Sequence, residues 1–177
     1  MRIGFIIYGS LDTISGGYLY DRQLVHHLRQ QGDEVRILSL PWTRYGDHLL
    51  HNLSSRIPEQ LRALSLDLLL QDELNHPSLF WLNRRLGKLL PCPIVSIVHH
   101  LRSSENHPIP LMPLYRWAER QYLRTVDGFI FNGKTTRSAV AALSKEEKPH
   151  VIAYPAADHI PPGVDRNTVK ERAHEPR

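Results

Sequence analysis

The chain has 177 residues, 41% of them hydrophobic, which suits one compact domain and is short for two substantial ones. Its 22 basic and 18 acidic residues give a formal net charge of +4, which suits an anionic partner without identifying one. The single cysteine excludes an internal disulfide framework, and no apolar run approaches the ~20 residues that span a bilayer, so we expect a cytoplasmic protein.

Short apolar runs alternate along the chain with longer amphipathic stretches. The apolar runs predict six strands, at residues 2–8, 34–40, 66–71, 93–100, 127–132 and 150–154. Helices fill the gaps, with the plainest patterns at residues 17–31, 58–65, 78–90 and 135–143. A polar, histidine-containing segment runs from the second strand to Ser55.

Near-continuous apolar strands that alternate with helices are typical of a parallel sheet covered on both sides. We therefore expect an α/β fold with a Rossmann-like, doubly wound, mostly parallel sheet of about six strands and helices on both faces. It forms one domain over residues 1–160, and the charged, proline-rich residues 161–177 form a connector or tail. Such sheets bind ligands at the carboxyl ends of their strands, so the candidate residues follow each strand.

A glycine pair, Gly16 and Gly17, follows the first strand where the first helix begins. Glycine lets a ligand approach the backbone closely, and the unpaired amides of a helix N-terminus suit a phosphate. The pair matches neither the G-x-G-x-x-G fingerprint nor the phosphate loop, because no lysine follows it. The alternative is that the pair only forms a turn, with Ser15 capping the helix.

Several segments together resemble family 4 glycosyltransferases. The opening "MRIGFIIYGSLDTISGGYLYDRQLVHHLRQQGDEVRIL" resembles the family's first strand, glycine loop, helix and second strand. Further segments resemble, in order, its third strand, its strand ending in histidine, its helix–strand–helix unit and its interdomain connector: "LDLLLQDE", "PIVSIVHHL", "WAERQYLRTVDGFIFNGKTTRSAV" and "HVIAYPAADHIPPGVD". The resemblance covers residues 1–165.

This resemblance implies a two-domain GT-B architecture, with an acceptor-binding N-terminal domain and a C-terminal domain that binds the nucleotide sugar. By position, Gly16 and Gly17 would face the donor diphosphate. His99 would approach the reacting sugar as an orienting and hydrogen-bonding group in a retaining reaction, with His100 as the alternative. A histidine that ends a strand can also be purely structural. Three further residues that follow strands are expected to bind substrate: Arg102, Lys134 and Thr135.

The chain departs from the family pattern in two places. The donor-binding half, with its glycine-and-lysine loop and paired glutamates, has no counterpart, and Asn132-Gly133 replaces the serine expected after the fifth strand. We therefore expect a partner, either a donor-binding C-terminal domain or a separate subunit. The acceptor would be a glycan, a lipid or a small molecule, and the nucleotide sugar a co-substrate, with no other cofactor. The alternative is a non-catalytic Rossmann-like module for binding or assembly.

Two other patterns carry weaker signals. The 11 histidines include no H-E-x-x-H motif. In the doublets His26-His27 and His99-His100 the two side chains should point in different directions, so we expect no metal site. The sequence has no basic stripe with exposed aromatic residues, so we expect no nucleic-acid partner.

The predicted helix around residue 117 carries basic and apolar side chains at helical spacing. They are Arg116, Arg120 and Arg124, interleaved with Leu114, Trp117 and Tyr122. Such a helix could lie on anionic lipid at the inner face of the membrane. Alternatively, its basic face is solvated and its apolar side packs on the sheet.

Overall fold

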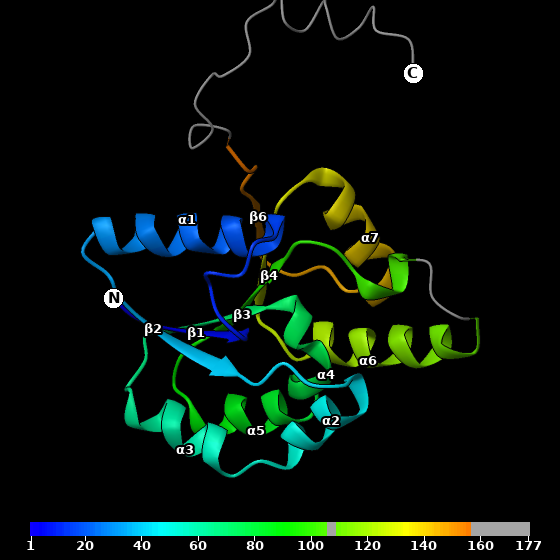
Figure 1. Cartoon of the computed structure of the whole chain (residues 1–177), viewed down its shortest axis with the longest axis horizontal. Coiled ribbons are helices and arrows are strands. Elements are labelled where there is room, and N and C mark those ends of the chain that lie inside the picture. Colours follow the sequence, from blue (N-terminus) through cyan, green and yellow to red (C-terminus); the bar gives the residue numbers. More distant parts are fainter. Residues whose placement is uncertain (106–108, 157–177) are drawn as a thin grey trace, which may run out of the picture.

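The predicted fold class is correct. The computed structural model describes residues 1–105 and 109–156, so the predicted tail at 161–177 lies outside the described residues. Six parallel strands form one sheet in the order β2-β1-β3-β4-β5-β6 (Figure 1). The strands are β1 (Arg2–Tyr8), β2 (Glu34–Leu40), β3 (Leu68–Asp72), β4 (Ile94–Val98), β5 (Gly128–Phe131) and β6 (His150–Ile152).

Helices cover both faces of this sheet. They are α1 (Gly16–Gln30), α2 (Tyr45–Leu50), α3 (Arg56–Ala63), α4 (His76–Leu79), α5 (Leu82–Leu89), α6 (Met112–Arg124) and α7 (Lys134–Ser144). The strand order runs one way from β1 to β2 and the other way from β3 to β6. Right-handed crossovers then place α1 on one face and the later helices on the opposite face. Figure 1 shows α1 on one side of the strands and α3 and α5 on the other.

Each face has its own hydrophobic core. On the α1 face, Tyr18 and Val25 pack with alternate residues of β1, such as Phe5. On the opposite face, the larger core joins Leu61 of α3 and Tyr122 of α6. Because both faces are covered, every residue of β1 from Ile3 to Tyr8 is buried, which explains its uninterrupted apolar pattern.

The first helix begins and ends as its sequence predicts. Ser15 Oγ accepts a hydrogen bond from the backbone N–H of Tyr18, which confirms the N-cap. At the other end Gly32 adopts a positive φ of 87°, a conformation that glycine reaches without strain. The glycine pair at the start of α1 is therefore part of a capped helix.

The helix predicted at 78–90 is split into α4 and α5. Asn52 causes the break, because its side-chain oxygen accepts the backbone N–H groups of Trp81 and Leu82. Its amide nitrogen donates to the carbonyl of Pro77, which in a continuous helix would accept from Trp81. Asn52 follows α2, a helix within the polar segment that the pattern did not predict. A contact across 29 residues thus interrupts a strong local helix pattern.

Candidate functional site

The carboxyl ends of β1, β3 and β4 meet the start of α1 at one edge of the sheet. The strand order reverses at β1, so this edge is the expected place for a ligand. His99 directly follows β4, Asp72 ends β3, and Glu73 comes next. Asp21 points to the same place from the second turn of α1, where it bonds to His99. We call His99, Asp21, Asp72 and Glu73 the His99 cluster.

The imidazole of His99 is held by residues of α1. Its Nε2 lies 2.9 Å from Asp21 Oδ1, and only 11% of the side chain is exposed. A Cβ atom at Gly17 would lie 3.4 Å from His99 Cδ2, an ordinary van der Waals distance, so the helix backbone runs close beside the ring. Tyr20 meets the imidazole edge-on, with ring centroids 5.0 Å apart. These contacts fix the ring at the edge of the sheet.

The backbone of His99 is held by the neighbouring strands. Its N–H donates to Glu73 Oε2 at 2.9 Å. Its carbonyl accepts from Asn132 Nδ2 at 2.9 Å and from Thr136 Oγ1 at 3.4 Å. His99 therefore links the residues after β3 to those after β5.

Three buried carboxyl groups crowd this site, and burial changes their protonation. Burial raises the pKa of Asp72 to about 7, and the charge on Asp21 adds to the shift. Burial also raises the pKa values of Asp21 and Glu73. Burial alone would lower the pKa of His99, but its hydrogen bond to Asp21 and the charges of Asp21 and Asp72 raise it overall. The raised pKa values of the three carboxyl groups favour their protonated forms, and His99 and Asp21 hold each other through a short hydrogen bond.

The same cluster has the spacing of a metal site. Ligand atoms of Asp21, Asp72 and His99 all lie within 4.8 Å of one another. Among the described residues, Asp21 Oδ2 is buried without a hydrogen-bond partner. The expectation of a metal-free site stays a prediction.

An open pocket of about 220 Å³ lies over the loops that follow β1 to β4. Its aromatic and basic lining residues are Tyr8, Trp42, Tyr45, His48, His76 and Arg102, and we call it the Arg102 pocket. Leu74 also lines it and directly follows Glu73, so the pocket adjoins the His99 cluster along the chain. The edge of the sheet thus combines a buried titratable cluster with an open aromatic pocket.

The sequence model of Glycosyltransferase Family 4 matches residues 19–167 of the 177-residue chain. The chain belongs to this family. No curated protein sequence matches it. The match confirms the resemblance inferred from the sequence and indicates glycosyl transfer as the chemistry. It begins at Leu19, so the glycine pair precedes the matched region.

Several of the residues expected from the family pattern do meet at this edge. His99 lies at the end of a central strand beside Gly17, whereas Gly16 is exposed and an added Cβ there would touch nothing within 4 Å. His100 is exposed, with Nε2 3.8 Å from Glu105 Oε1. Arg102 lines the adjoining pocket. The catalytic and binding roles of these residues stay predictions.

Two further expected residues follow β5, and their binding role stays a prediction. Lys134 and Thr135 are exposed on the first turn of α7. The neighbouring Thr136 reaches the His99 carbonyl instead, and its hydroxyl also donates to Asn132 Oδ1 at 2.6 Å. The helix turns about 100° per residue, so adjacent side chains point in different directions. Asn132 stands where the family has a serine. Its side chain contacts His99 by donating to the His99 carbonyl.

The sequence interpretation missed the acidic partners of His99. Asp21 lies four residues after Gly17 and therefore on the same face of α1, a spacing that could have suggested it. Asp72 and Glu73 follow β3 directly, as binding residues of this fold often do, but the sequence does not indicate that they are buried.

The basic helix α6 packs mainly on the rest of the domain. Tyr122 is buried and donates to Ser96 Oγ, so it is not part of an exposed apolar stripe. Arg120 Nε donates to the carbonyl of Leu143, and Arg124 pairs with Glu146 at 3.2 Å. These contacts favour the packed-helix interpretation. Within the described part of the chain, no helix is both long and apolar enough to cross a membrane.

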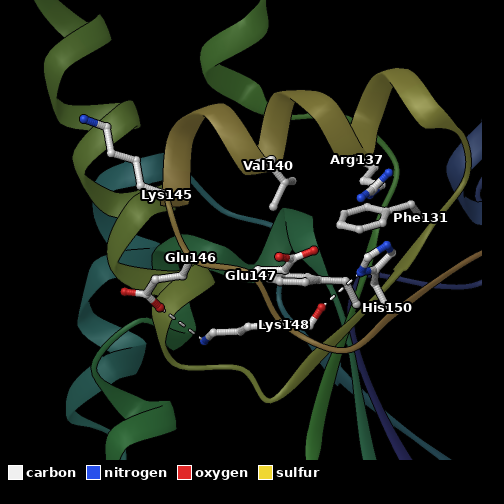
Figure 2. Close-up of a pocket in the computed structure, with 10 residues that line it drawn as sticks. Phe131, Arg137, Val140, Lys145, Glu146, Glu147, Lys148 and His150 are labelled. Carbon is white, nitrogen blue, oxygen red and sulfur yellow. Dashed lines mark hydrogen bonds and ion pairs between the residues drawn. The ribbon is translucent and has the colours of Figure 1, made fainter.

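A separate hollow of about 360 Å³ lies beneath α7, beside β5 and β6 (Figure 2). Its rim is charged, but Lys148 Nζ lies 3.8 Å from Glu146 Oε2 and donates to three backbone carbonyls at the end of α6. That ammonium stabilises the helix C-terminus. None of the expected site residues lines this hollow, so we place the candidate site at the His99 cluster.

Proposed function

We propose that this chain is the acceptor-side half of a retaining glycosyltransferase that moves a sugar from a nucleotide sugar to an acceptor. A donor-binding domain or subunit would supply the other wall of a GT-B cleft. The observation that carries the proposal is the meeting of His99, Asp21 and Gly17 at the carboxyl edge of the sheet, in a chain of this family.

The geometry suggests a division of roles. Within the described residues, the backbone amides of Gly16 and Gly17 donate to no protein acceptor, so the start of α1 is free to bind the donor diphosphate. Asp21 fixes the orientation of His99, whose imidazole would hydrogen-bond the reacting sugar or the acceptor. Stabilising a departing diphosphate requires groups on both sides of the cleft, so we expect the chain alone to be inactive.

A second candidate is a non-catalytic binding module that uses the same edge. The observation that favours it is the low exposure of His99, 11% of the side chain, together with bonds to both its ring and its backbone. In this case His99 stabilises the fold and contacts no substrate. The two candidates predict different outcomes for the same substitution.

The test compares His99→Ala with His100→Ala in an enzyme completed by a donor-binding half. Glycosyl transfer is measured per folded molecule, together with the melting temperature. We expect His99→Ala to lower turnover by about 10² to 10⁴, because a positioned polar group is lost from the transition state. His100, which is exposed and lies 3.8 Å from Glu105 Oε1, is the matched comparison and should have a much smaller effect.

The opposite pattern would exclude this assignment. If His99→Ala lowers only the melting temperature and leaves turnover per folded molecule intact, His99 has a structural role. The chain alone is assayed in parallel with a panel of nucleotide sugars. Transfer by the chain alone would contradict the need for a second half.

A further inference from the structure

The cation of the Arg102 pocket is the Arg102 guanidinium. The Arg102 guanidinium carbon lies 5.3 Å from the ring centroid of Tyr45 and 4.9 Å from that of Tyr115. Across residues 1–105 and 109–156, no N–H group of this side chain donates to a protein acceptor, and its Nε is buried. A guanidinium carries five N–H donors in a planar fork that matches an oxyanion. The aromatic rings hold the cation in place without using those donors.

The lining of the pocket offers Arg102 no acidic partner. None of the residues that line the pocket is acidic. Burial raises the pKa of the nearby Glu119 carboxyl, although the charge of Arg102 opposes this shift, and the carboxyl accepts from the Ser103 N–H at 3.3 Å. No ion pair joins Arg102 to an acid in the described part of the chain. The pocket therefore has a positive charge to offer to an anion.

Burial lowers the pKa values of both histidines of the pocket, His48 and His76, and His76 helps to fix its shape. Burial lowers the pKa of His76 to about 3. His76 Nδ1 lies 3.0 Å from the carbonyl of Glu73, so this nitrogen must be the donor. Nε2 of the neutral ring is then an acceptor, and the Tyr45 hydroxyl donates to it at 3.1 Å. This chain of hydrogen bonds holds the Tyr45 ring against Arg102.

Trp42 provides a second type of surface in the same pocket. Its side chain is 62% exposed, and its ring stands edge-on to Tyr8 with centroids 5.4 Å apart. An indole exposed at a polar pocket suits the apolar face of a ring with hydroxyl groups. The volume of about 220 Å³ lies below the range of roughly 300 to 1,000 Å³ for whole-ligand pockets, so one ring-sized group fits.

We propose that the Arg102 pocket binds a phosphorylated monosaccharide or polyol, with its phosphate on Arg102 and its ring against Trp42. Calling this ligand the acceptor rests on the proposed function. The binding site itself does not, because it is inferred from the free guanidinium and the pocket around it. An Arg fork on a dianionic phosphate gives paired, charge-assisted hydrogen bonds, which a neutral sugar cannot provide.

The experiment is calorimetric titration of the full chain with four probes: glucose 6-phosphate, glucose, inorganic phosphate and glucuronate. We expect glucose 6-phosphate to bind at least tenfold more tightly than any other probe. Arg102→Gln should weaken its binding at least tenfold. The matched control is Arg116→Gln, which removes the same charge from an exposed position of α6 outside the pocket and should leave binding unchanged.

Further variants separate the two parts of the ligand. Trp42→Ala should weaken glucose 6-phosphate binding but not phosphate binding. Arg102→Lys should restore less than half of the lost binding free energy, because lysine lacks the planar fork. Melting temperatures show that each variant is folded.

Three outcomes overturn the proposal. In the first, glucose 6-phosphate binds equally well to the parent and to Arg102→Gln. In the second, inorganic phosphate or glucuronate binds as tightly as glucose 6-phosphate. In the third, neither glucose 6-phosphate nor inorganic phosphate binds. The titration requires no nucleotide sugar and no glycosyl transfer. The binding proposal can therefore fail even if a completed enzyme transfers a sugar to a neutral acceptor. It can equally succeed in a chain whose completed form transfers no sugar.

Discussion

The His99 cluster and the Arg102 pocket lie at the same edge of the sheet but are built in opposite ways. In the cluster, Asp21, Asp72 and Glu73 are buried, and their neighbours supply most of their hydrogen bonds. In the pocket, the rings of Tyr45 and Tyr115 pack against the cation, and Trp42 is exposed. In the cluster, neighbouring protein groups fix the position of His99. In the pocket, N–H groups of Arg102 remain available to a ligand.

This difference has an energetic consequence. Removing a group from a satisfied, buried network leaves a partner without a hydrogen bond, which costs folding stability. Removing a group that bonds only to a ligand should cost binding and little stability. Substitutions in the cluster should therefore lower the free energy of unfolding, and Arg102→Gln should lower ligand affinity.

The largest stability effect is expected for Glu73→Ala. Glu73 Oε2 accepts the backbone N–H of His99, and the truncated side chain would leave that donor buried and unpaired. We expect a loss of about 1 to 3 kcal/mol in the free energy of unfolding, measured by urea denaturation. Glu73→Gln is the control, because its amide oxygen can still accept this bond. Equal losses in the two variants would show that the hydrogen bond is not the cause.

The pH dependence of stability should change in Asp72→Asn. The pKa of Asp72 in the folded chain, about 7, is above the unfolded value of 3.8, so the folded state binds the extra proton between these values. Its contribution to stability is present below about pH 4 and is lost as pH rises through 7. The asparagine side chain does not titrate, so the variant should gain stability relative to the parent between pH 5 and 8. Melting temperatures of the variant and the parent at pH 5 and at pH 8 measure this gain.

Comparing the two proteins at the same pH removes the contribution of titratable groups that do not interact with Asp72. Burial lowers the pKa values of His48, His51 and His76, which opposes the trend in both proteins and cancels in the difference. Asp21, Glu73 and His99 remain in both proteins, but the Asp72 charge raises the pKa values of Glu73 and His99, so the difference includes the effect of Asp72 on these neighbours. Glu59→Gln, an exposed change on α3, is the control and should show a constant difference. A constant difference for Asp72→Asn would contradict the prediction.

The smallest stability effect is expected for the glycine pair. Neither Gly16 nor Gly17 has a positive φ, so alanine fits both positions and should raise stability by about 0.4 to 1 kcal/mol. Only the methyl group at Gly17 would lie beside the His99 ring, at 3.4 Å. In the completed enzyme, Gly17→Ala should lower turnover about tenfold more than Gly16→Ala. Equal turnover in the two variants would separate Gly17 from the reaction.

The sequence alone determined the α/β class, the six strands and the candidate position of His99. These features depend on local pattern, because a buried parallel strand is apolar along its whole length and ligands collect where such strands end. The capped start of α1 was likewise readable from Ser15 and the glycines that follow it. The order of the motifs also indicated the family that the match confirms.

Only the tertiary structure decided how the site is assembled. Asp21 and His99 are 78 residues apart, and no local pattern shows that their side chains bond. The break between α4 and α5 depends on Asn52, a distant residue that replaces the helical hydrogen bonds of Trp81. Likewise, the position of the Arg102 guanidinium depends on two rings from other elements, those of Tyr45 and Tyr115. Sequence pattern records which face of an element is buried, whereas hydrogen bonding and pKa depend on which distant groups that face meets.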